Sequence, residues 1–205
     1  MKKVLIAVSA ATMLSLGANA QSIEPEVGVN FGSVQTKTGN TTSKGDGMMT
    51  LSAGLGLKYD LTDNVYLRPG IFYSGTGIKS QLLGITSTAR YDYIQVPVTL
   101  GFNYDMNKAG ALFAEVGPYV GYALSGKTTI ESSLGSTKND IKFGSKLTET
   151  NALDYGAKFG VGYVTPFNIF VRAQYNLGLG NLSNASNTTT NNKYWNVSVG
   201  YRVAF

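Results

Sequence analysis

Two residue types that often carry out catalysis, His and Cys, are absent from this 205-residue chain. A Ser nucleophile would therefore need a Lys or another base to activate it. The sequence has no Gly-x-Ser-x-Gly motif, no constellation of paired carboxylates and no cluster of residues with metal-ligand spacing. These observations predict that the protein is not an enzyme and holds no metal and no cofactor.

Charged side chains offer a different chemistry, because a buried charge needs a partner of opposite sign. Seven charged residues fall at alternating positions that we assign below to the interior of the fold: Glu26, Lys58, Arg68, Glu115, Lys158, Arg172 and Arg202. We expect these residues to form an interior network of ion pairs and hydrogen bonds.

The elements that would position these charges are strands. Apolar and polar residues alternate along eight segments, because successive side chains of a strand point to opposite faces. The segments cover residues 24–37, 48–61, 65–79, 89–106, 111–129, 151–165, 169–181 and 192–205. Each is longer than the roughly five or six residues common in soluble proteins. Pro69, Pro97 and Pro118 lie inside three of them and leave the local register open, because Pro donates no ladder hydrogen bond.

The connections between the segments alternate strictly between short and long. Short connections with turn-forming residues lie at 62–64, 107–110 and 165–168. Long polar connections lie at 38–47, 80–88, 130–150 and 182–191. In an up-and-down sheet, this alternation places all long loops at one end, which is the layout of a transmembrane barrel.

The two faces of the strands differ in polarity. The segment around Pro97 places Ile94, Val98 and Phe102 on one face and Gln95 and Thr99 on the other. A charge on a lipid face near the bilayer centre costs about 2–4 kcal/mol, and the apolar faces carry none. We therefore predict an eight-stranded antiparallel up-and-down transmembrane β-barrel with short periplasmic turns and long extracellular loops. The alternative is a soluble two-sheet sandwich whose apolar faces point inward.

The N-terminus predicts export. Lys2 and Lys3 precede an apolar stretch from Val4 to Leu16, and Ala18-Asn19-Ala20 has the pattern of a signal-peptidase site. We predict a signal peptide at residues 1–20 and a barrel domain at residues 21–205. The net charge of +5 is too small and too scattered to indicate nucleic-acid binding.

Two segments carry a family resemblance. The chain ends in YRVAF, and residues 91–104 read YDYIQVPVTLGFNY. Together with the signal and the eight strands, they resemble the small outer-membrane β-barrel proteins of Gram-negative bacteria, the porin family or outer membrane β-barrel domain group, with OmpX- and OmpA-like barrels. The resemblance implies a barrel that faces outer-membrane lipid. It also implies that Phe205 is a signal for the outer-membrane assembly machinery, and that catalysis is absent, since the enzymes among such barrels resemble one another in using His.

The interior of an eight-stranded barrel is just filled by side chains. We therefore expect a structural or surface-interaction role, in which the long loops bind an extracellular protein or another surface ligand. The alternative is a narrow gated pore that weakly prefers anions, since bases outnumber acids among the seven interior charges. The longest loop, 130–150, is either a protruding hairpin that binds partners by strand addition or an ordinary solvated loop.

Overall fold

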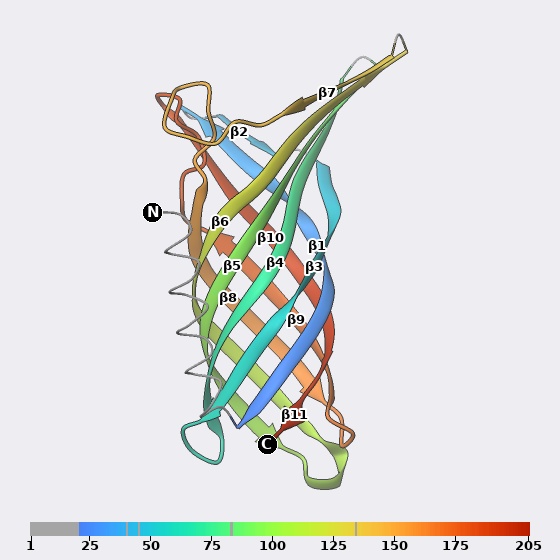
Figure 1. Ribbon diagram of the computed structural model, residues 1–205, viewed down its shortest axis with the longest axis vertical. Coiled ribbons are helices and arrows are strands. Elements are labelled where there is room, and N and C mark those ends of the chain that lie inside the picture. Colours follow the sequence, from blue (N-terminus) through green and yellow to red (C-terminus); the bar gives the residue numbers. More distant parts are fainter. Residues whose placement is uncertain (1–20, 40, 45, 83, 134) are drawn as a thin grey trace.

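A computed structural model describes residues 21–205 except residues 40, 45, 83 and 134, so the predicted signal peptide lies outside the described residues (Figure 1). The chain forms strands and one short 3-10 helix: β1 (Ser22–Thr38), β2 (Thr41–Lys44), β3 (Asp46–Asp60), β4 (Val65–Leu82), β5 (Ile85–Asp105), η1 (Asn107–Ala109), β6 (Ala111–Ser132), β7 (Gly135–Asp140), β8 (Leu153–Val164), β9 (Ile169–Gly178), β10 (Thr188–Tyr201) and β11 (Val203–Ala204). No helix in the described part of the chain is long and apolar enough to cross a membrane.

Eight of the strands close into a ring of antiparallel neighbours. Their order is β1, β3, β4, β5, β6, β8, β9 and β10, and β10 pairs back to β1 from Glu26↔Gly200 to Thr38↔Thr188. The short strands add to this ring, since β2 pairs with β1, β7 pairs with β6, and β11 pairs with the start of β1. The predicted barrel is therefore confirmed, and the two-sheet sandwich is wrong, because a ring leaves no open sheet edge in the wall.

The burial of side chains follows the predicted alternation. Leu51 and Val161 on the outside are 65% and 60% exposed, whereas Gln95 and Thr99 on the inside are 0% and 1% exposed. Aromatic side chains lie where the apolar band ends; Tyr175 and Trp195, on neighbouring strands, have ring centroids 5.1 Å apart. Tyr and Trp favour such boundaries because one end of the ring is apolar and the other reaches water. The apolar face of this barrel points outward, and the interior is polar.

The short turns are fixed by their own polar side chains. Asn107 and Asn168 adopt positive φ angles of 57° and 63°, which Asn tolerates better than most residues. The Asp105 carboxylate accepts a hydrogen bond from the Asn107 amide at 2.7 Å, and the Thr62 hydroxyl accepts one from the Val65 amide at 3.0 Å. These turns lie at the end of the barrel opposite the long loops (Figure 1).

The three strand prolines leave the register unchanged. Pro69, Pro97 and Pro118 face Val98, Tyr119 and Ala157, and the pairing keeps the same register on both sides of each proline. The β4–β5 and β5–β6 ladders each miss a few pairs near Pro69 and Pro97, as expected where a donor is lacking. Register shifts occur elsewhere, at Asp92/Tyr93 between β5 and β6 and at Gly47/Ser52 between β3 and β4.

Part of the sheet rises beyond the barrel at the long-loop end. This part, which we name the extension, consists of residues 76–82 of β4, 85–92 of β5, 125–132 of β6 and all of β7 (Figure 1). The strands β4, β5 and β6 are longer than predicted by three to four residues at this end. The Asp92 carboxylate lies at the base of the extension and accepts hydrogen bonds from Tyr73 Oη at 2.6 Å, Ser125 Oγ at 2.8 Å and Arg90 Nε at 3.1 Å.

These contacts keep Asp92 ionised. Partial burial raises the pKa of Asp92, but the hydrogen bonds from Tyr73 and Ser125 and the charge of Arg90 lower it more. The base of the extension is therefore held by a charged group that stays charged at neutral pH.

The remainder of the longest loop is a docked segment. The Asn184 side-chain amide donates to the carbonyl oxygens of Gly144 at 2.8 Å, Glu149 at 2.9 Å and Lys146 at 3.3 Å. The backbone also joins the two loops, since the Asn151 amide donates to the Leu182 carbonyl at 2.9 Å. Loop 130–150 is thus a hairpin followed by a segment tied to the 181–190 loop, and the prediction of an ordinary solvated loop is wrong.

We expect Asn184→Ala to loosen this docked segment without affecting the barrel. The substitution removes the donor shared by three carbonyl oxygens, and a net loss of about 1 kcal/mol translates into roughly fivefold faster hydrogen exchange. The amides of Gly144 and Thr150, which hold the segment together, report this change. The Val171 amide in the barrel wall is the control, and equal acceleration there would show a global effect instead.

Candidate functional site in the barrel interior

Six charged side chains meet in the half of the interior nearest the short turns. They form what we name the ion-pair cluster, which contains three carboxylates and three guanidinium groups: Glu24, Glu26, Glu115, Arg68, Arg172 and Arg202. They come from β1, β4, β6, β9 and the residue that links β10 to β11. The alternation of side-chain direction points these residues into the interior, and the register of the neighbouring strands brings them to one level of the barrel.

Glu24 contacts all three arginines of the cluster. Its carboxylate accepts hydrogen bonds from Arg68 Nε at 2.6 Å, Arg202 Nε at 2.7 Å and Arg172 Nη2 at 3.1 Å. The side chain is fully buried. Glu24 was not among the seven predicted interior charges, although it points to the same face as Glu26 two positions later, and this spacing could have predicted it.

Arg172 is the cation that joins the three carboxylates. It pairs with Glu24 at 3.1 Å, with Glu115 at 3.3 Å and with Glu26. Its guanidinium also lies over the rings of Phe170 and Phe113, with centroids at 4.6 Å and 5.1 Å. Arg suits this position because its planar group can serve several carboxylates and stack on aromatic rings at once.

Tyr66 and two glycines complete the cluster. The Tyr66 hydroxyl donates to Glu115 at 2.8 Å. A Cβ atom at Gly101 would collide with the Tyr66 ring, and one at Gly56 would collide with the Arg68 guanidinium. The many glycines inside the strands therefore include positions where a missing side chain gives room to a large buried polar one.

Two of the seven residues predicted for the network lie outside the ion-pair cluster. Lys58 pairs with Asp60 at the short-turn end and lies 4.9 Å from the Tyr66 ring centroid. Lys158 lies deeper, 5.4 Å from the Tyr119 ring centroid, and forms no ion pair within 4.0 Å among the described residues. The structure brings the other five residues together: Glu26, Arg68, Glu115, Arg172 and Arg202.

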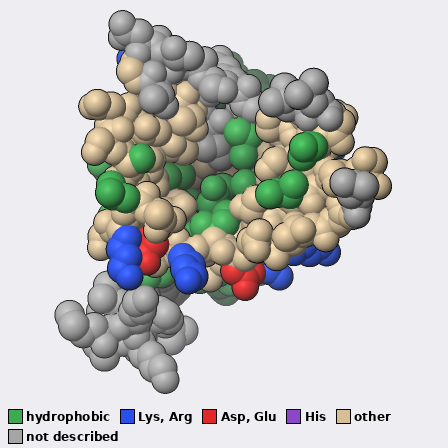
Figure 2. Space-filling model, turned by 90° about the horizontal axis from the view of Figure 1, so that it is seen from above, with side chains coloured by type: hydrophobic (Ala, Val, Ile, Leu, Met, Phe, Trp, Pro, Cys, Tyr) green, Lys and Arg blue, Asp and Glu red, His purple; other side chains and the backbone are tan. Residues whose placement is uncertain are grey.

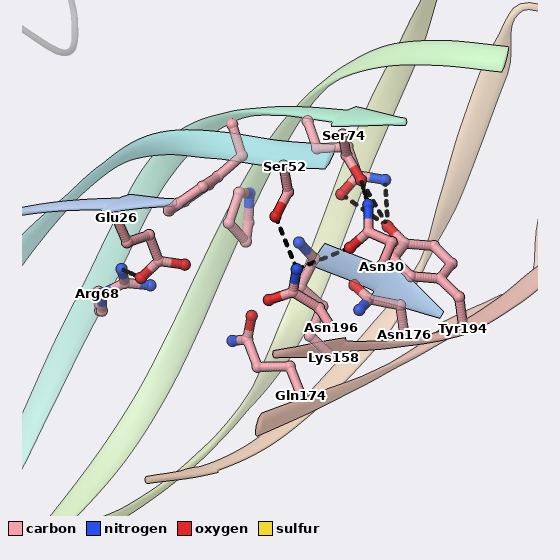
Figure 3. Close-up of a pocket in the computed structure, with 13 residues that line it drawn as sticks. Glu26, Asn30, Ser52, Arg68, Ser74, Lys158, Gln174, Asn176, Tyr194 and Asn196 are labelled. Carbon is pink, nitrogen blue, oxygen red and sulfur yellow. Dashed lines mark hydrogen bonds and ion pairs between the residues drawn. The ribbon is translucent and has the colours of Figure 1, made fainter. Parts of the chain in front are cut away.

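Uncharged polar side chains fill the middle of the interior (Figure 3). The Asn196 amide donates to Asn30 Oδ1 at 2.7 Å and to Ser52 Oγ at 2.8 Å, and the Asn30 amide donates to Ser74 Oγ at 3.0 Å. The Gln95 amide donates to the Tyr194 hydroxyl at 3.0 Å, so hydrogen bonds link strands across the barrel. These bonds give partners to the Asn30, Gln95 and Asn196 amides, which the closed wall removes from water.

The interior cavities are small. One of about 20 Å³ is lined by Lys158, Asn176 and Tyr194 among others, and one of about 10 Å³ lies beside Thr76 and Asn192. A cavity needs roughly 10–15 Å³ to hold one water molecule, so each has room for about one. Among the described residues, no group of three or more His, Cys, Asp or Glu could hold a metal ion. The arrangement joins the strands across the barrel and fills its interior.

Comparison with known proteins places this barrel in a family. Residues 19–184 match the family described as outer membrane protein beta-barrel domain. No curated protein matches the chain.

Solved structures with a similar arrangement are remote in sequence. Ail, the attachment invasion locus protein of Yersinia pestis, is 15% identical with a TM-score of 0.40, and the match covers 90% of this chain and 99% of that one. Neisserial surface protein A is 15% identical with a TM-score of 0.45, covering 89% and 97%. The N-terminal barrel domain of OprF from Pseudomonas aeruginosa is 13% identical with a TM-score of 0.42, covering 90% and 98%.

The family match extends over most of the chain, and the closed ring, the apolar outer face and the polar interior agree with it. The chain therefore belongs to the outer membrane protein beta-barrel domain family, and the protein is an integral protein of the bacterial outer membrane.

Proposed function

We propose that the protein is a non-catalytic surface-interaction protein, in which the barrel anchors the extension and the extension binds an extended segment of a partner by strand addition. In this proposal the apolar outer face contacts outer-membrane lipid, and the exposed Phe205 is the group that the assembly machinery reads. The absence of His and Cys from the chain supports a role without catalysis.

The observation that carries the proposal is the free edge of β7. All six residues of β7 are exposed, and the strand pairs with β6 alone among the described strands. An unpaired strand edge presents a row of N–H and C=O groups, which is a template for another strand. This exposed edge lies on the part of the sheet that rises above the barrel at the long-loop end, where a partner has access to it (Figure 1).

The packing of the interior favours this role over the alternative of a narrow gated pore. Ions need a continuous path, whereas the ion-pair cluster and the polar side chains above it occupy the interior, and the two spaces that they line measure about 20 and 10 Å³. The charges of the cluster also balance, so the predicted preference for anions loses its basis.

A substitution in β7 that prevents a partner strand from pairing with the free edge, but keeps the β6–β7 hairpin, tests the proposal. The Ile141 amide donates to the Gly126 carbonyl of β6 at 2.9 Å, so the alternation of the antiparallel ladder places the Lys138 N–H on the free edge. Lys138→Pro therefore removes a donor that β6 does not use. We expect a fluorescent (Thr-Val)4 peptide to bind wild-type protein in nanodiscs and to lose at least about tenfold in affinity with Lys138→Pro, because ladder hydrogen bonds give the affinity. Fluorescence anisotropy measures both.

Lys138→Ala is the matched control, since it removes the same side chain and keeps the N–H. Binding that is unchanged in Lys138→Pro, or absent in the wild type, would contradict the proposal. Sustained single-channel conductance of the wild type in planar bilayers would favour the pore.

A further inference from the structure

We propose that the partner of the β7 edge is the β7 edge of a second copy of this protein in an apposed membrane. The inference rests on the proposed role of the extension and names its partner. It follows from the hydrogen-bonding parity of β7, the order of its charges and the orientation of the extension.

The parity of β7 determines which residues present backbone groups to the free edge. The Ile141 amide donates to the Gly126 carbonyl at 2.9 Å, and antiparallel partners alternate between hydrogen-bonded and non-hydrogen-bonded pairs. Asn139 and Thr137 therefore bond to β6, opposite Thr128 and Ile130. Ser136, Lys138 and Asp140 direct their N–H and C=O groups to the free edge.

The edge is complementary to itself. A two-fold axis through Asn139 pairs Lys138 of one copy with Asp140 of the other, and Asp140 with Lys138, as a symmetric interface requires. Both residues have their backbone groups on the free edge, so these are the hydrogen-bonded pairs of the new ladder. Asn139 faces Asn139 of the other copy between them, and its amide can both donate and accept.

The charges at this edge are available for such pairing. Lys138 and Asp140 are exposed and form no ion pair within the described part of the chain. They lie on the same face of β7, because they are two residues apart. Opposite charges directly across an antiparallel pair stabilise it, and like charges destabilise it. In this register the interface contains two favourable Lys138–Asp140 pairs. If one β7 strand shifts by two residues relative to the other, at least one of these pairs is lost.

The neighbouring charges lie on the same face of the extension. The register places Lys127 opposite Asp140, Glu131 opposite Ser136 and Thr129 opposite Lys138 on β6. Seen from above, charged side chains follow one side of the rim, whereas hydrophobic side chains surround the central hollow (Figure 2). The charged face remains exposed when two extensions join edge to edge, because strand addition uses the edge and not a face.

The orientation of the extension determines where the second copy must lie. The strands β4, β5 and β6 run from the barrel wall into the extension (Figure 1), and in this proposal the plane of the extension therefore keeps the direction of the wall, which contains the barrel axis. The two-fold axis of an antiparallel edge pair stands perpendicular to that plane and therefore reverses the barrel axis. The two barrels point toward each other, which means that they lie in two membranes. The inferred activity is adhesion between surfaces that carry the same protein.

Reciprocal charge reversal tests the inferred register. Phosphatidylcholine vesicles that carry the wild-type protein are expected to cluster, which turbidity measures. Vesicles with Lys138→Glu alone, or with Asp140→Lys alone, are expected to cluster at least about tenfold more slowly, because two attractive pairs become repulsive in a multivalent contact. Mixing these two populations restores clustering, since the introduced carboxylate of one variant then faces the introduced ammonium of the other. The native Asp140 of the first variant likewise faces the native Lys138 of the second.

Two additional variants distinguish pairing between identical copies from strand addition to another partner. The double variant Lys138→Asp/Asp140→Lys is expected to cluster with itself but not with the wild type, and Lys138→Pro is expected to abolish all clustering. Mixed single variants that stay dispersed, or wild-type vesicles that do not cluster, would overturn the homotypic inference. If (Thr-Val)4 still binds in that case, strand addition stands with another partner; if it does not, both proposals fail.

Discussion

Arg172→Met is expected to destabilise the barrel by about 3–5 kcal/mol, because it leaves buried carboxylates without their shared cation. Arg172 is fully buried and pairs with Glu24, Glu26 and Glu115. The space lined by Glu26 and Arg68 measures about 20 Å³, room for about one water molecule, so little solvent could take the place of the guanidinium.

Urea unfolding in lipid vesicles measures the effect. The chain has one Trp, and Trp195 lies on the outer face at the end of the apolar band, so its fluorescence reports insertion. Arg202→Met is the matched control. Its side chain is 14% exposed and, among the described residues, forms an ion pair with Glu24 alone, so we expect a loss of about 1–2 kcal/mol. Equal losses for the two variants would show that Arg172 has no special place in the cluster.

Val199→Arg is expected to cost about 2–4 kcal/mol, the penalty for a cation on the lipid face near the bilayer centre. Val199 lies on β10 between Val27 and Val171 of its two neighbouring strands and is 45% exposed. If this exposed surface faces lipid, as we propose, acyl chains and not water would have to solvate the introduced charge. The same unfolding measurement, together with the heat-dependent mobility shift on SDS gels, detects the change.

Gln81→Arg places the same charge on the extension, where β4 has left the apolar band. We expect a change within about 0.5 kcal/mol there, as for other exposed positions. A similar penalty at both sites would contradict the assignment of the outer face to lipid, and a negligible penalty at Val199 would contradict it as well.

The alternation of apolar and polar residues was sufficient to predict the wall of the barrel. Ile94, Val98 and Phe102 face outward and Gln95 and Thr99 face inward as predicted, because a strand side chain has only two directions available. The strand number and the order of short and long connections followed from the same pattern. The resemblance to the outer-membrane family is confirmed by the family match.

The outer ends of the strands could not be predicted in the same way. Residues such as Thr86, Ser87 and Thr88 on β5 have no apolar alternation, and they are strands because β4 and β6 supply hydrogen-bond partners on both sides. A periodic pattern of residues contains no information about which strands pair.

The role of Asn184 could not be predicted from the pattern either, because its side-chain amide holds a loop some 40 residues away in the sequence.

The alternation of side-chain direction predicted which charged residues point into the interior. It did not predict which of these residues contact one another. Lys58 and Arg68 have the same inward direction, yet Lys58 pairs with Asp60 at the barrel end and Arg68 pairs with Glu24 and Glu26. The difference depends on the stagger of neighbouring strands, which sets the height of each residue along the barrel. Lys158 likewise lies above the cluster and interacts with the Phe72 and Tyr119 rings.

The pairing of β1 with β10 has a consequence for the order in which the barrel forms. Every other neighbouring pair in the ring joins strands that follow one another, so each needs only a hairpin or a short excursion of the chain. The β1–β10 pair joins residues as far apart as Glu26 and Gly200. Because the entropy cost of closing a loop grows with its length, and local pairs form faster than distant ones, ring closure is the last step. Until then the two outermost strands keep open edges, and the barrel is a curved sheet whose first and last strands have not met.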